Sequence, residues 1–110
     1  VKHRNSLETW SAAPVLFNSD HLTYDFSTGA GTAYGNNLVD LHDGSFAIWS
    51  GDVNQDGIIG LPDLNLIEAL SQNFVFGYVA EDLNGDLFVE SVDYSLVENN
   101  SQLLLFVARP

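Results

Sequence analysis

Two acidic segments, thirty residues apart, carry the side chains best suited to chemistry in this chain. They are the twelve-residue loops 52–63 and 82–93, each with oxygen-bearing side chains at positions 1, 3, 5 and 12 and an aliphatic residue at position 8. This spacing wraps a short turn around one hard cation, and position 7 adds its main-chain carbonyl. The loops therefore predict calcium binding. The alternative interpretation is an Asp/Asn-rich turn that holds its own backbone amides.

The distribution of charge supports a cation within these loops. The net charge is −12, and the basic residues are Lys2, Arg4 and Arg109, all near the ends of the chain. Ten of the fifteen carboxylates lie between Asp52 and Glu98, with no Lys or Arg among them. Such a cluster repels itself unless a counter-charge lies inside it, and a divalent cation supplies one. The lack of a basic patch argues against nucleic acid as a partner.

Composition sets the broad class. A chain of 110 residues with 45% hydrophobic residues can form one compact unit with a core. No apolar run is long enough to span a bilayer, and without an initiator Met or signal peptide the chain resembles a mature product or a fragment. The absence of cysteine excludes disulfides and thiolate metal sites. Because calcium is plentiful outside the cell, we expect a secreted or cell-surface protein.

The acidic loops belong to a longer internal repeat. Shifting the sequence by thirty residues matches nine identical positions beginning with Asp52 and Asp82 and ending with Phe76 and Phe106. After each loop, apolar residues recur at three- and four-residue spacing, which predicts a helix of two to three turns. The apolar runs 74–79 and 103–107 then have the length and composition of strands. The repeating unit is therefore predicted to be loop, helix and short strand.

The first fifty residues follow a different pattern. Short apolar runs at 15–17, 22–26 and 47–49 are separated by turn-rich stretches, and residues 1–10 have the pattern of a further strand. We therefore predict an α+β chain, with a small antiparallel β-rich unit at 1–50 and a double calcium-loop module at 51–110, packed together as one unit. The strand-like ends of the chain are expected to belong to a larger sheet.

Residues 51–110 resemble the dockerin type I repeat, a duplicated calcium loop followed by a helix. The run Gly51-Asp52-Val53-Asn54-Gln55-Asp56-Gly57 is similar to the opening of that family, and an Asp at position 12 is typical of it. The strand-like segment 45–50 before the first loop suits a dockerin better than an EF-hand, which needs a helix there. Residues 1–50 resemble the β-rich stretch that precedes such loops in secreted proteins of Bacteroidetes-type bacteria, through His3-Arg4-Asn5 and Tyr24-Asp25-Phe26.

This resemblance implies two calcium sites with matching ligands. The ligands implied for the first site are the side chains of Asp52, Asn54, Asp56 and Asp63 and the carbonyl of Ile58. Those for the second are the side chains of Asp82, Asn84, Asp86 and Asp93 and the carbonyl of Phe88. Position 9 is Gly60 in the first loop, where water would complete the shell, and Glu90 in the second, where the side chain could add a ligand or hold a water.

Two departures from the family pattern change what is expected. Position 6, where the chain turns sharply, is Gly57 in the first loop but Leu87 in the second, and a left-handed Leu87 would cost roughly 1–2 kcal/mol. The positions that dockerins use to contact cohesins hold Leu61-Pro62 and Ser91-Val92, and neither helix contains Lys or Arg. These differences predict a weaker or differently shaped second site, and they argue against a cohesin partner of the cellulosome type.

Other polar clusters have simpler interpretations. His42 lies between Asp40 and Asp43, and Asp20 precedes His21, but no nucleophile motif or phosphate loop accompanies either pair. Surface or turn histidines are the better explanation, so we predict no enzyme activity. Trp10, Trp49 and the tyrosines could stack against sugars, although core packing is the simpler interpretation. Asn99-Asn100-Ser101 matches the glycosylation triplet, a motif that often arises by chance.

The sequence as a whole predicts a non-catalytic, calcium-stabilised structural or interaction module of a secreted bacterial protein. Its partner would be another protein or further copies of itself. One alternative is a self-assembling subunit of a fibre or adhesin, joined through the strand-like ends Val1-Lys2-His3 and 103–107. A second alternative is a carbohydrate-binding module.

Overall fold

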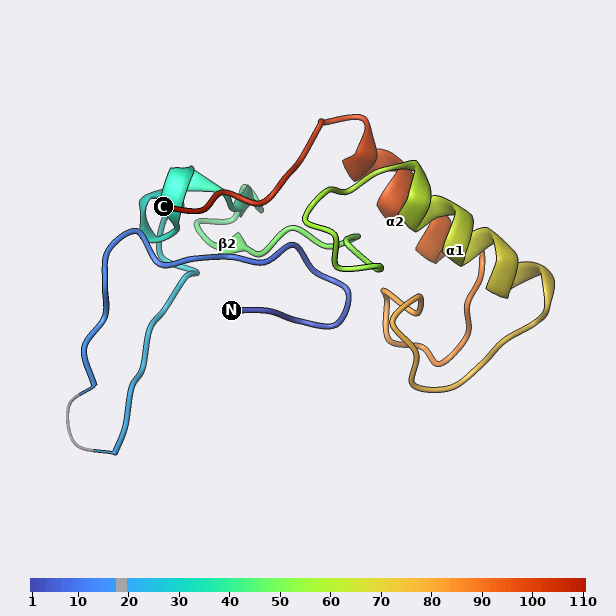
Figure 1. The fold of residues 1–110 in the computed structure, drawn as a ribbon, viewed down its shortest axis with the longest axis horizontal. Helices are drawn as coiled ribbons and strands as arrows, with labels where there is room; N and C mark the ends of the chain where they lie inside the picture. Colours follow the sequence, from blue (N-terminus) through green and yellow to red (C-terminus); the bar gives the residue numbers. More distant parts are fainter. Residues whose placement is uncertain (18–19) are drawn as a thin grey trace. The chain divides into compact units, whose positions relative to one another are not determined.

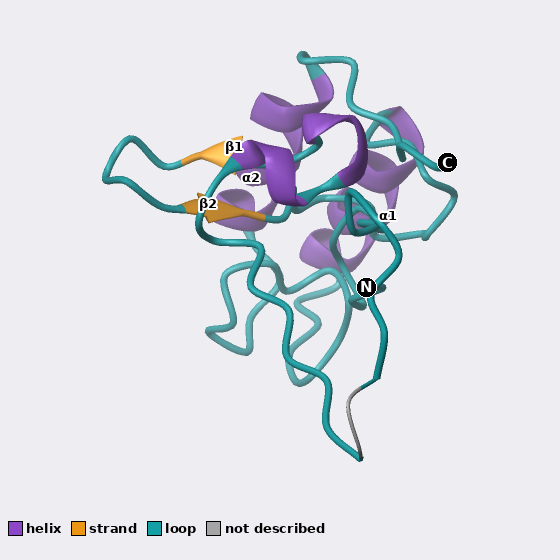
Figure 2. Ribbon diagram, turned by 90° about the vertical axis from the view of Figure 1, so that its left-hand side faces the viewer, coloured by secondary structure: helices purple, strands orange, loops and turns teal. Residues whose placement is uncertain are grey.

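The computed structural model describes residues 1–17 and 20–110, and its regular elements are few and short (Figure 1). In chain order they are η1 (Ala30–Thr32), η2 (Tyr34–Asn36), β1 (Val39–Asp40), β2 (Phe46–Ala47), α1 (Leu61–Gln72) and α2 (Ser91–Ser101). Figure 2 colours the helices and the strands differently; in the described residues the strands form one two-stranded antiparallel sheet, which pairs Val39 with Ala47 and Asp40 with Phe46. The predicted α+β class is confirmed at this level.

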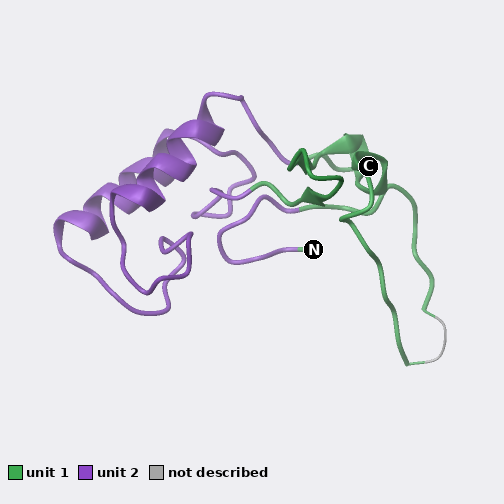
Figure 3. Cartoon of the chain, turned by 180° about the vertical axis from the view of Figure 1, so that it is seen from behind, with its two compact units in different colours: residues 1, 9–49, 108–110 green, residues 2–8, 50–107 purple. Residues whose placement is uncertain are grey.

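The residues divide into two compact units, shown in different colours in Figure 3. The first unit comprises residues 1, 9–49 and 108–110, and the second comprises residues 2–8 and 50–107. Both acidic loops and both α-helices belong to the second unit. The short segment 2–8 from the start of the chain also belongs to it.

The first unit is held mainly by turns and isolated backbone contacts. Segment 10–12 runs beside 32–34 through hydrogen bonds from the Ala12 amide to the Thr32 carbonyl at 2.9 Å and from the Tyr34 amide to the Trp10 carbonyl at 2.8 Å. Its buried apolar residues are Ala33 and Leu38. The expected β-rich character is therefore limited to one short hairpin and single bridges.

The predicted strands in residues 1–50 are shorter than expected for a local reason. Residues 1–10 contribute an isolated bridge between Ser6 and Ser50 rather than a strand. Asp25 and Asp43 each accept a hydrogen bond from the amide two residues later, which bends the chain into an Asx turn. Gly35 adopts φ 69° inside η2, a left-handed conformation that a strand does not contain.

The two helices form where the repeat predicted them. Pro62 lies in the first turn of α1, where its missing N–H leaves no hydrogen bond unmade. Leu64 and Ile67 form the buried face of α1, and Val97 is fully buried on α2. The two helices pack against each other (Figure 1), and their buried side chains contribute to the core of the second unit.

The segment after each helix pairs with the acidic loop of the other repeat. The Ile59 amide donates to the Leu105 carbonyl at 3.0 Å, and the Val89 amide donates to the Val75 carbonyl at 3.1 Å. The Val107 amide likewise binds the Gly57 carbonyl at 2.8 Å. Because all these partners are related by a thirty-residue shift, the second unit has an internal pseudo-twofold arrangement.

The predicted strands 74–79 and 103–107 are reduced to single bridges in this arrangement. The bridges join Phe76 to Phe88 and Ile58 to Phe106. Phe74 and Leu104, at equivalent positions after the two helices, have φ of 52° and 54° and therefore turn the chain away from an extended path. None of the helices in the described residues has both the length and the apolar character needed to cross a membrane.

Candidate metal centre

The carboxylate at loop position 12 ties the two ends of its loop together. Asp63 has no exposed surface, and its Oδ1 accepts hydrogen bonds from the amides of Val53 at 2.8 Å and Asn54 at 3.1 Å. Its Oδ2 accepts from the Gly60 amide at 2.9 Å, next to the start of α1. Asp93 is equally buried and makes the corresponding three contacts in the second loop. One carboxylate therefore closes the loop and caps the helix.

The carboxylate at loop position 1 holds the middle of the turn. Asp52 is 1% exposed and accepts hydrogen bonds from the Asp56 and Gly57 amides, both at 3.1 Å. Asp82, also 1% exposed, accepts from the corresponding amides of Asp86 and Leu87. These side chains point into their own loops, as both the calcium interpretation and the self-held turn require.

The side chains at positions 3 and 5 lie at the exposed rim of each loop. Asn54 accepts a hydrogen bond from the Asp56 amide, and Asp56 accepts one from the Ile58 amide, both at 2.9 Å. Asn84 and Asp86 repeat these contacts in the second loop. All four are solvent-exposed, so a change at position 5 disturbs less of the fold than a change at position 1 or 12.

The main-chain carbonyls predicted as position-7 ligands keep free coordination capacity. Ile58 and Phe88 occupy non-hydrogen-bonded positions of their bridges, because the neighbouring residues make the cross-repeat hydrogen bonds. Within the described residues, neither carbonyl accepts a hydrogen bond. At position 9, Gly60 and Glu90 contact position 12 through their amides, and the Glu90 side chain is exposed.

The carboxylates of the first loop affect each other's ionisation. The pKa of Asp52 is raised, chiefly by burial, and the negative charges of Asp63 and Asp56 raise it further, against the lowering effect of the Gly57 and Asp56 amides. No ion pair in the described residues involves Asp52, Asp63, Asp82 or Asp93. Four carboxylates are thus buried with backbone amides as their partners.

The donor set fits a hard cation. The loops offer only oxygen donors, whereas the three histidines are exposed and lie outside the loops. Among residues 1–17 and 20–110, however, no group of three or more His, Cys, Asp and Glu side chains is arranged to hold a metal ion. The predicted ligand set of each loop also includes an Asn amide oxygen and a main-chain carbonyl, and a cation would have to draw its three carboxylates closer together.

Two positions in each loop have positive φ, and sequence reasoning identified only one of them. Leu87 has φ 74°, so it adopts the left-handed conformation that Gly57 adopts at φ 88°. Position 4 is also left-handed, with Gln55 at φ 61° and Gly85 at φ 80°. In each loop, one of these two positions is a glycine: position 6 in the first loop (Gly57) and position 4 in the second (Gly85). The sole sequence signal for position 4 was Gly85 itself.

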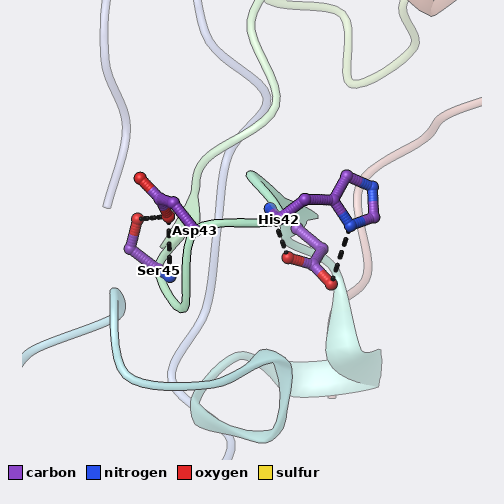
Figure 4. Close-up of polar contacts among 4 residues, drawn as sticks. His42, Asp43 and Ser45 are labelled. Carbon is purple, nitrogen blue, oxygen red and sulfur yellow. Dashed lines mark hydrogen bonds and ion pairs between the residues drawn. The ribbon is translucent and has the colours of Figure 1, made fainter.

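The polar residues around His42 in the β1–β2 hairpin form two separate sets of contacts, as Figure 4 shows. The His42 ring lies 3.6 Å from the Asp40 carboxylate, and the His42 amide donates to the same side chain at 2.8 Å. The Ser45 hydroxyl and amide both donate to Asp43. No hydrogen bond between His42 and Ser45 is found in the described residues, and the contacts are those that stabilise turns.

The chain was also compared with known proteins. Neither protein-family models, nor curated proteins, nor solved structures give a match to it.

Proposed function

We propose that this chain is a non-catalytic, calcium-binding structural or interaction module of a secreted or cell-surface bacterial protein, with calcium stabilising the fold. The observation that carries the proposal is the burial of four carboxylates, Asp52, Asp63, Asp82 and Asp93, none of which forms an ion pair with a cationic side chain of the described residues. Burying an ionised carboxylate is costly unless an opposite charge or several hydrogen bonds compensate it.

Backbone amides supply part of that compensation, but they leave capacity unused. A carboxylate offers about four lone-pair sites, and each buried Asp accepts two or three hydrogen bonds. Each loop has carboxylates at positions 1, 5 and 12 next to a position-7 carbonyl that accepts no hydrogen bond within the described residues, and the second loop adds Glu90 at position 9. Calcium accepts six to eight oxygen ligands in flexible geometry, so these oxygens would serve as its ligands once the three carboxylates are drawn closer together.

The surface of the second unit supports an interaction role. It exposes large apolar side chains beside the loops, several more than half exposed: Ile58, Phe74, Phe76, Tyr78, Leu87, Phe88, Leu104 and Phe106. Phe74, Phe76 and Phe88 line a groove of about 460 Å³ with Glu90 at its edge. Contiguous apolar surface of this kind is characteristic of protein-binding sites. Calcium would then act by holding the loops that present this surface.

Calcium titration with melting measurements tests the proposal. The parent chain should bind two Ca²⁺ ions, and at a hundredfold excess over the dissociation constant each should add about 2.7 kcal/mol to the free energy of unfolding. Asp56→Asn and Asp86→Asn keep an oxygen for the Ile58 or Phe88 amide and remove one charge, so each should lose one ion. Glu68→Gln is the control, since it removes the same charge from exposed α1 surface in the same unit. Identical melting in calcium and in chelator would refute the proposal.

The first alternative is a self-assembling subunit of a fibre or adhesin. The exposed side chains of Leu103, Leu104 and Phe106 favour it, because they leave apolar surface on one strand-like end of the chain. Light scattering distinguishes the calcium-stabilised module from the self-assembling subunit. A monomer that loosens on calcium removal supports the module, and growth into elongated particles only with calcium supports the subunit.

A sugar-binding role, the second alternative, has one supporting feature. Trp10 is 45% exposed and lines a small groove in the first unit together with Tyr34, whereas Trp49 is partly buried. Saturable binding to a glycan array that is lost in Trp10→Ala would favour this function.

A further inference from the structure

The main-chain carbonyl at loop position 1 is held by a side chain in both repeats, but the side chains come from different places. In the first loop, the Gln55 side chain donates from Nε2 to the Asp52 carbonyl at 2.6 Å. The equivalent of Gln55 in the second loop is Gly85, which has no side chain. There, Arg4 Nη2 and Asn5 Nδ2 donate to the Asp82 carbonyl, each at 3.3 Å.

Arg4 and Asn5 belong to the segment 2–8, which we name the strap. The strap is anchored in the second unit: Leu7 is 1% exposed, Asn5 is 5% exposed, and the Asn5 carbonyl accepts the Gly51 amide at 2.8 Å. Ser6 also bridges to Ser50. These contacts hold the strap in place independently of the Arg4 side chain.

Arg4 fixes the chain that leads into the second loop. Its Nε donates to the Val79 carbonyl at 3.4 Å, and its guanidinium carbon lies 4.1 Å from the centre of the Tyr78 ring. Together with the bond to Asp82, these contacts span residues 78–82. A planar guanidinium can make all three contacts at once, whereas a lysine ammonium cannot.

We infer that Arg4 and Asn5 are positioning residues for the second calcium loop, which depends on the strap, whereas the first loop supplies the equivalent contact itself. This inference rests on the proposed calcium function. The second loop needs the support more, because Gly85 has no side chain to hold the Asp82 carbonyl, whereas Gln55 holds the Asp52 carbonyl from within the first loop. In the first loop, Gln55 donates to the Ser6 carbonyl of the strap at 3.1 Å, a main-chain contact that a substitution at Arg4 leaves intact.

Calcium titration of Arg4→Ala in two backgrounds tests the inference. In Asp56→Asn, where the second loop is the remaining site, affinity should fall about tenfold, the factor expected for one lost charge-assisted hydrogen bond. In Asp86→Asn, where the first loop remains, affinity should change less than about twofold. Equal losses in both backgrounds would overturn the inference.

Coulomb's law predicts the opposite sign for a purely electrostatic role. Removing a positive charge beside an acidic loop should strengthen calcium binding, so weaker binding identifies positioning. Lys2→Ala is the matched control, since it removes the same charge from an exposed residue of the strap. Arg4→Lys keeps the charge and most of the aliphatic stem and should still lose most of the affinity. Full recovery in Arg4→Lys would show that the guanidinium contacts are not needed and would overturn positioning by Arg4.

Amide hydrogen exchange without calcium separates failure of this inference from failure of the calcium function. The amides of Gly85, Asp86 and Leu87 donate to the Asp82 carboxylate. They should exchange faster in Arg4→Ala, while the Asp56 and Gly57 amides should keep their parental rates. Unchanged exchange of the amides of residues 85–87 would refute the positioning role of Arg4 even if calcium binds. Faster exchange of these amides alone would support the positioning role of Arg4 even if calcium does not bind.

Discussion

The left-handed conformation of Leu87 allows a test of the loop geometry that does not depend on metal. Leu87 has φ 74° and is 53% exposed, so replacing it changes both backbone strain and partial burial. Leu87→Ala and Leu87→Gly lose the same burial beyond Cβ and differ in whether a Cβ is present. A left-handed residue with a Cβ costs about 1–2 kcal/mol, and the greater freedom of unfolded glycine offsets about 0.5–1 kcal/mol of that.

Leu87→Gly should therefore be more stable than Leu87→Ala by about 0.5–1 kcal/mol, the reverse of the usual order for these residues. For a unit of this size the difference corresponds to about 3–6 °C in melting temperature, measured in chelator. Gly57→Ala is the counterpart in the first loop and should be destabilising, since a Cβ there would meet Val107 Cγ1 at 2.9 Å. If urea denaturation gives Leu87→Ala a free energy of unfolding equal to or greater than that of Leu87→Gly, the assignment of strain to this position is wrong.

Two further predictions concern the buried carboxylates in calcium-free buffer. Asp63→Ala should lower the free energy of unfolding by about 3 kcal/mol or more, because it leaves three amides without their acceptor, whereas Asp56→Ala at the exposed rim should cost less than about 1 kcal/mol. Equal losses in urea denaturation would contradict that assignment. Because the folded state raises the pKa of Asp52, folded protein binds that proton more tightly than unfolded protein, so this group's contribution should fall as pH rises above the ordinary Asp value. Urea denaturation at increasing pH above the ordinary Asp pKa should show a stability loss from this group that Asp52→Asn removes, and an identical pH dependence in that variant would contradict the pKa assignment. Asp25 and Asp43, whose pKa values are lowered mainly by Ser27 and Ser45 hydroxyls, have the opposite sign and lose their contribution only at more acidic pH.

Periodicity and spacing were sufficient to predict the helices and part of the geometry of the loops. Helical spacing of Leu64 and Ile67 behind Pro62 predicts α1 because these features act within a few residues. The same is true of the position-12 carboxylates, whose hydrogen bonds lie within their own loops. The left-handed state of Leu87 also follows from its alignment with Gly57.

The strands and the strap depend on contacts that local sequence does not encode. The runs 74–79 and 103–107 have strand composition, yet each makes a single bridge because its partner is the loop of the other repeat. The role of Arg4 depends on residues more than seventy positions away, and nothing near Arg4 in the sequence indicates it. Calcium itself stays a prediction, since loop hydrogen bonds of this kind suit both a metal site and a self-held turn.

The cross-pairing of the repeats explains why two copies are useful when each loop appears complete. Ile59 and Val89, both buried at position 8, receive their backbone partners from Leu105 and Val75 of the opposite repeat. A single repeat would expose this apolar residue and leave its amide without the partner found here. Order in one loop therefore supports the segment that closes the other. In this arrangement a loop that is strained at Leu87 and lacks a side chain at Gly85 can be retained, because the first repeat and the strap both stabilise it.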